Sequence, residues 1–115
     1  MRIYHNPRCS KSRQSLTLLE ERGESPTVVE YLKEPLDEMQ LRELVAALGL
    51  TAHDIVRVEE PEYKTCGLSS ESTEDEIIEA VSRHPRLLQR PIVVKDGKAV
   101  IGRPPENVLE LFQRE

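Results

Sequence analysis

Residues 3–13 of the chain read Ile-Tyr-His-Asn-Pro-Arg-Cys-Ser-Lys-Ser-Arg, and this stretch decides the fold. It places Cys9 between a short strand, predicted over Arg2–His5, and an amphipathic helix, predicted over Ser10–Arg22. Unpaired backbone N–H groups and the positive end of the dipole at a helix N-terminus stabilise a thiolate. The same helix end attracts oxyanions. The stretch therefore predicts a reactive thiol and an anionic substrate, and three cations lie beside the thiol in sequence: Arg8, Lys11 and Arg13.

Two units of secondary structure are predicted at the two ends of the chain. A second strand over Thr27–Tyr31 completes a strand–helix–strand unit of the size of a parallel βαβ crossover. Near the other end, residues 92–101 predict a β-hairpin with a type I′ turn at Asp96-Gly97, followed by a helix from Pro104-Pro105. A βαβ unit plus a ββα unit, with a cysteine after the first strand, is the layout of a thioredoxin-like α/β fold with a mixed sheet.

The middle of the chain, about residues 36–88, predicts a helical insertion between these halves. Capping boxes begin two helices, one at Asp37 with Gln40 and one at Thr73 with Glu76. A short helix or turn is expected over 51–57, and the acidic segment 58–72 is expected to be an irregular loop. The whole chain, residues 1–115, is predicted to be a single domain.

Composition excludes several classes of protein. The chain has 115 residues, 32% of them charged, with a formal net charge of −5, which argues against a nucleic-acid-binding protein. It lacks an apolar run near 18 residues, so we expect no membrane span, and no secretory signal is recognisable. The two cysteines are far apart and the three histidines are scattered, so we expect no metal site and a reducing cytoplasmic location.

Cys9 belongs to a C-x-x-S motif, so the position of a local resolving thiol is taken by Ser12. Ser12 could donate a hydrogen bond to the thiolate or to a bound anion, and a mixed disulfide would need an external thiol. His5 is either a partly exposed residue at the strand end or a histidinium or hydrogen-bond donor that lowers the pKa of Cys9. Cys66 is a candidate resolving thiol, but a small packing residue is the favoured interpretation. A Cys9–Cys66 disulfide stays open.

Three arginines are candidate anion ligands because a guanidinium grips a tetrahedral oxyanion through two N–H groups: Arg57, Arg90 and Arg103. Taken singly, each could be a solvated surface charge. A thioredoxin-like layout would bring Arg90-Pro91 near the Cys9 helix, and it makes a cis peptide bond before Pro91 the expectation.

Three separated motifs resemble those of the glutaredoxin-linked arsenate reductases (ArsC-like proteins): residues 3–13, Gln-Arg-Pro-Ile-Val-Val at 89–94 and Gly-Arg-Pro-Pro-Glu at 102–106. The similarity covers essentially the whole chain and is greatest to compact members of about this length. It implies a thioredoxin-like fold and an arsenate reductase in which the Cys9 thiolate attacks arsenate to form a covalent Cys–arsenic adduct. Glutathione, as co-substrate, and glutaredoxin, as partner, would resolve this adduct and release arsenite, with no bound cofactor. The resemblance also implies anion-binding roles for Arg57, Arg90 and Arg103, with His5 and Ser12 as supporting residues.

Two other functions stay open at this point. A glutathione-dependent thiol–disulfide oxidoreductase would exchange disulfides without any oxyanion. A transcription regulator of the Spx type shares the fold and binds RNA polymerase. The C-x-x-S motif and Arg103-Pro104-Pro105 favour an enzyme over the regulator, because many such regulators use a C-x-x-C switch and lack this arginine.

Overall fold

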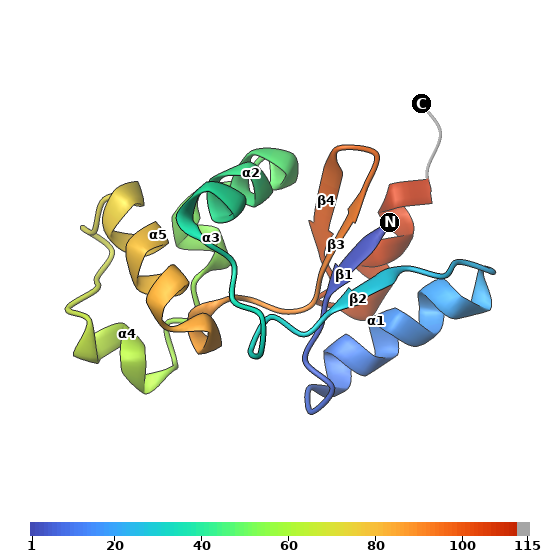
Figure 1. The fold of residues 1–115 in the computed structure, drawn as a ribbon, viewed down its shortest axis with the longest axis horizontal. Helices are drawn as coiled ribbons and strands as arrows, with labels where there is room; N and C mark the ends of the chain where they lie inside the picture. The colour runs from blue at the N-terminus through green and yellow to red at the C-terminus, as the bar shows by residue number, and fades with distance from the viewer. Residues whose placement is uncertain (113–115) are drawn as a thin grey trace. The chain divides into compact units, whose positions relative to one another are not determined.

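A computed structural model describes residues 1–112 of the chain (Figure 1). The chain divides into two compact units. The sheet unit comprises Met1–Glu34 together with the described residues from Arg90 onward, and the helical unit comprises Pro35–Gln89. The organisation of both as a single domain stays a prediction.

The sheet unit contains four strands: β1 (Arg2–Tyr4), β2 (Thr27–Val29), β3 (Ile92–Lys95) and β4 (Lys98–Ile101). Their order in the sheet is β2-β1-β3-β4, with β1 parallel to β2, antiparallel to β3, and β3 antiparallel to β4. Ile3 in the central strand β1 pairs with Val28 on one side and Val93 on the other. This mixed sheet, built from a βαβ and a ββα segment, confirms the predicted thioredoxin-like fold.

Two helices of the sheet unit pack against each other, α1 (Ser10–Glu21) and the 3₁₀ helix η2 (Pro105–Phe112). One fully buried cluster joins them to the two central strands: Ile3, Leu19, Val93 and Val108. Each such side chain contributes about 1.5–3 kcal/mol on removal from water. The cluster therefore fixes α1 against the two central strands of the sheet.

The predicted boundaries in this unit are mostly confirmed. The β3–β4 turn has positive φ at both central residues, 51° at Asp96 and 78° at Gly97, as a type I′ turn requires. Strands β1 and β2 are shorter than predicted, since they end at Tyr4 and Val29 rather than at His5 and Tyr31. The final helix is present, but it is a 3₁₀ helix.

The helical unit contains α2 (Glu38–Leu48), α3 (Ala52–Ile55), α4 (Pro61–Thr65), α5 (Glu74–Arg83) and the 3₁₀ turn η1 (Pro85–Leu87). Both predicted capping boxes are present, at the N-termini of α2 and α5. The prediction of an irregular loop over residues 58–72 is wrong in part, because α4 forms within it. Proline at its first position, with a preset φ and no N–H to satisfy, begins this short helix. None of the helices described over residues 1–112 is of a length and apolarity that would let it cross a bilayer.

Candidate active site

Cys9 is the N-cap residue of α1, with an extended backbone (φ −92°, ψ 121°). Hydrogen bonds hold the loop between β1 and α1 in place. The Cys9 N–H donates to the Asn6 carbonyl at 3.0 Å, and the Cys9 carbonyl accepts from the Arg13 N–H at 3.0 Å. The Asn6 side chain accepts from the Arg8 N–H, also at 3.0 Å. The thiol therefore lies where the prediction placed it, at the start of a helix and on a hydrogen-bonded loop.

The pKa of the Cys9 thiol is below its ordinary value. Burial on its own raises this pKa, but three groups that favour the thiolate outweigh it: the Ser12 N–H, the Arg90 guanidinium and the Lys11 N–H. Two of these are free N–H groups of the first helical turn, as the helix position predicts. Cys9 is thus a better nucleophile near neutral pH than an ordinary cysteine.

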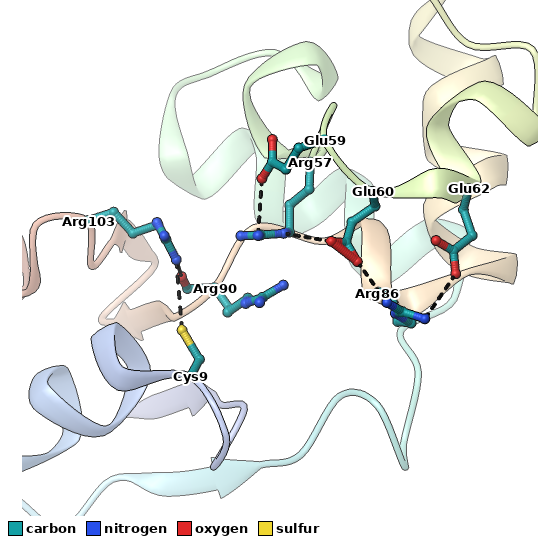
Figure 2. A network of polar contacts seen from close by, with 8 residues as sticks. All are labelled: Cys9, Arg57, Glu59, Glu60, Glu62, Arg86, Arg90 and Arg103. Carbon is teal, nitrogen blue, oxygen red and sulfur yellow. Dashed lines mark hydrogen bonds and ion pairs between the residues drawn. The ribbon is translucent and has the colours of Figure 1, made fainter.

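Arg90 and Arg103 both lie at Cys9 in the sheet unit. Arg103 Nη1 contacts Cys9 Sγ at 3.8 Å and donates to the Arg90 carbonyl at 3.0 Å, so Arg103 points toward the thiol in Figure 2. Arg90 Nε is buried and, among the described residues, has no hydrogen-bond partner. A buried charged donor of this kind is costly unless a ligand pairs with it. The site therefore combines a nucleophile with two cations, one of which keeps a free N–H.

The peptide bond before Pro91 is cis, as expected, and so is the bond between Arg103 and Pro104. Gly102 directly precedes Arg103 in the sequence, and its N–H donates to the Pro91 carbonyl at 2.9 Å. A Cβ at position 102 would lie 2.5 Å from Ser15 Oγ and 2.8 Å from Pro91 Cγ. Sequence reasoning missed this glycine and also Asn6; their only signal was their position, directly before Arg103 and directly before Pro7.

His5 and Ser12 form a buried pair that differs from the predicted arrangement. Ser12 Oγ lies 2.7 Å from His5 Nδ1 and accepts from the Asn6 N–H at 3.0 Å. Ser12 therefore acts on Cys9 through its backbone N–H, while its hydroxyl joins the end of β1 to α1. Burial lowers the pKa of His5 below 6.5; Glu30 opposes this shift and Arg13 adds to it. This shift favours the neutral imidazole. His5 is thus a buried partner of Ser12 and not the partly exposed residue considered above, and its supporting role at Cys9 stays a prediction.

Arg57 belongs to the helical unit, so its predicted place at Cys9 stays a prediction. It is not a solvated surface charge, since its side chain is 11% exposed and ion-paired with Glu59 at 3.1 Å and Glu60 at 3.9 Å. Its backbone N–H donates to the Leu87 carbonyl at 2.7 Å.

Cys66 is exposed at the C-cap of α4, which makes the favoured packing interpretation wrong. The helix that forms in the predicted loop turns this side chain to solvent. Both cysteines are free thiols. A resolving role for Cys66 stays a prediction.

The fold and the site define a class: thioredoxin-like proteins with a single thiol at the N-terminus of the first helix and arginines beside it. Within that class, the chain belongs to the ArsC family, whose family model matches residues 4–111.

Three relatives illustrate the similarity. The chain is 50% identical over 113 residues to the uncharacterized protein YfgD of Escherichia coli, covering 96% of this chain and 95% of the relative. It is 47% identical over 110 residues to an arsenate reductase of Neisseria meningitidis, covering 94% of each. The solved structure of an arsenate reductase from Vibrio cholerae superposes with a TM-score of 0.91 at 45% identity, covering 95% of this chain and 94% of the other.

Proposed function

We propose that this protein is an arsenate reductase that uses Cys9 as its nucleophile. The observation that carries the proposal is the lowered pKa of the Cys9 thiol, with Arg103 Nη1 3.8 Å from its sulfur and a free Arg90 Nε nearby. A thiolate flanked by guanidinium groups is equipped to attack a tetrahedral oxyanion. The names of its relatives in Neisseria meningitidis and Vibrio cholerae support arsenate as that oxyanion.

In the first step, the Cys9 thiolate attacks the arsenic of arsenate. A sulfur–arsenic bond forms, one arsenic–oxygen bond breaks, and the oxygen leaves as water after taking up protons; arsenic stays As(V). Arg90 and Arg103 hold the remaining oxygens and stabilise their negative charge. We propose that Arg57 serves as the third ligand of the oxyanion and that Pro91 shapes the wall opposite the thiol.

In the second step, the thiol of glutathione replaces another oxygen on arsenic, and a second water leaves. A thiolate of glutaredoxin then attacks the glutathione sulfur. The bond between this sulfur and arsenic breaks with its electron pair moving to arsenic, which becomes As(III), while glutathione leaves on glutaredoxin as a mixed disulfide. Hydrolysis of the remaining Cys9–arsenic bond releases arsenite and regenerates the thiol. Because Ser12 is no thiol, the reductant must come from outside this motif, as it would in a reducing cytoplasm.

The test is arsenate-dependent oxidation of glutathione in the presence of glutaredoxin. Cys9→Ser is expected to abolish activity, because a hydroxyl is not ionised at neutral pH. Cys66→Ser is the matched control and is expected to keep it. Activity that survives in Cys9→Ser would contradict the mechanism. Glutathione–disulfide exchange by the wild type, with no arsenate turnover, would indicate a thiol–disulfide oxidoreductase instead.

A further inference from the structure

Arg57 carries a charge that is nearly removed from water, so it needs anionic partners. Two adjacent carboxylates supply them: Glu59 Oε1 lies 3.1 Å from Nη2, and Glu60 Oε2 lies 3.9 Å from Nε. Nε is nevertheless buried without a hydrogen bond to any described residue, because 3.9 Å is too long for one. Only the contact with Glu59 is short enough to be a hydrogen-bonded ion pair.

The two carboxylates differ in how firmly they are held. Glu60 is 15% exposed, and its other oxygen accepts from Arg86 Nη2 at 3.2 Å. Arg86 in turn pairs with Glu62 at 3.7 Å, so Glu60 lies inside a chain of charges that Figure 2 shows running on from Arg57. Glu59 stands at the free end of this chain. Its side chain is 56% exposed and would be readily solvated on leaving Arg57.

A guanidinium binds an oxyanion best through two parallel N–H groups, and Nε with Nη2 forms one such edge. In Arg57 these are the two nitrogens nearest to Glu60 and Glu59. We infer that Glu59 is a stand-in carboxylate, which occupies Arg57 in the resting protein and is displaced when an oxyanion binds. This inference rests on the proposed function of Arg57 as an oxyanion ligand.

The two possible roles of Glu59, a partner that the oxyanion displaces and a structural partner of Arg57, predict different effects of Glu59→Gln on oxyanion binding. If Glu59 competes with the oxyanion, Glu59→Gln tightens oxyanion binding about two- to fivefold, the range expected for a partly exposed ion pair. If Glu59 merely orients Arg57, the same substitution weakens binding or leaves it unchanged.

The experiment measures the dissociation constant of inorganic sulfate by calorimetry, because this tetrahedral oxyanion binds without reacting at Cys9. Four variants are compared with the wild type: Glu59→Gln, Arg57→Gln, the double variant and Glu62→Gln. Glu62→Gln is the matched control, since it removes the same charge three residues along the chain, in α4, but Glu62 pairs with Arg86 and not with Arg57. The expected pattern is tighter binding in Glu59→Gln alone, with no effect of Glu59→Gln in the Arg57→Gln background.

Each of the other possible results of the sulfate titrations leads to one conclusion. Unchanged or weaker binding in Glu59→Gln, with weaker binding in Arg57→Gln, overturns the stand-in role and leaves the proposed function intact. An equal gain in Glu62→Gln, or a gain that persists without Arg57, also overturns it, because the effect would then come from the general field of the acidic residues of this segment. Sulfate affinity that does not depend on Arg57 removes Arg57 from the oxyanion site and overturns the inference with it.

Discussion

At the scale of single residues, the lowered pKa of Cys9 results from the groups around the thiol, against the effect of its burial. Burial opposes ionisation, and the thiolate is favoured only because N–H groups of α1 and the Arg90 guanidinium outweigh it. The lowered pKa should therefore depend on Arg90.

We expect Arg90→Gln to raise the pKa of Cys9. The measurement is the rate of alkylation by iodoacetamide against pH, made in a Cys66→Ser background so that one thiol reacts. The midpoint of the profile moves to higher pH in Arg90→Gln. The control is Arg8→Gln, which removes a cation near Cys9 in sequence that does not contribute to the shift. Identical midpoints with and without Arg90 would contradict the assignment.

The shifted pKa of His5 makes the free energy of unfolding depend on pH. Its pKa in the folded state is lowered, chiefly by burial, so the unfolded chain binds more protons than the folded chain as pH falls below about 6.5. The resulting contribution to stability is full above that pH and is lost as pH falls through the folded-state pKa. We expect the free energy of unfolding, measured in urea at pH 7.5 and pH 5, to fall less in His5→Gln than in the wild type. An equal fall in both proteins would show that His5 does not titrate in this way.

At the scale of elements, Gly102 is a point where three other segments approach the backbone closely. A Cβ there would meet Ser15 of α1, Pro91 before β3 and Val108 of η2, the last at 3.2 Å. We expect Gly102→Ala to destabilise the protein by about 1–3 kcal/mol in urea unfolding, since overpacking displaces buried groups. Arsenate turnover should fall as well, because Arg103 follows directly.

Ser15→Ala provides the control for that substitution. Ser15 Oγ is buried without a hydrogen-bond partner among the described residues, so its removal alone should stabilise the protein by about 1 kcal/mol. In the double variant it also relieves the 2.5 Å contact, and part of the Gly102→Ala loss should be recovered. If the changes in unfolding free energy of the two substitutions simply add, the contact with Ser15 Oγ is not what makes a side chain at position 102 unfavourable.

The elements that could be predicted from sequence were those with a local signature. Capping boxes gave the starts of α2 and α5, and Asp96-Gly97 gave the hairpin. Helix α4 was missed because it has only five residues and the acidic segment around it resembles a solvated loop. The exposure of Cys66 follows from that helix, so it could not be anticipated either.

For the candidate site, sequence gave the residue types and the helix position of Cys9. It did not give side-chain direction. The Ser12 hydroxyl could have faced the thiol, but Asn6 and His5 engage it, and both contacts depend on how the loop after β1 folds back on α1. Arg57 was a candidate by its residue type as well as by resemblance, but its immediate sequence carries no distinct signal, and its role stays a prediction.

At the scale of the whole molecule, the single-domain prediction can be tested through the two cores. Ile3 in the sheet unit and Ile77 in the helical unit are both fully buried. Truncation of either to alanine should cost about 3 kcal/mol. If the chain unfolds as one domain, hydrogen exchange will show lower protection in peptides of both units for either variant. Loss confined to the unit that carries the substitution would show two independently unfolding parts.

The buried Ser12 hydroxyl also bears on how readily this protein could evolve into a self-oxidising switch. A single codon change at position 12 would create C-x-x-C, yet it would replace a small oxygen acceptor by a larger, weaker one. The Asn6 N–H would lose its partner, and His5 would lose its short contact. A dithiol descendant would therefore need compensating changes in the loop before α1, so the packing around position 12 favours the C-x-x-S motif.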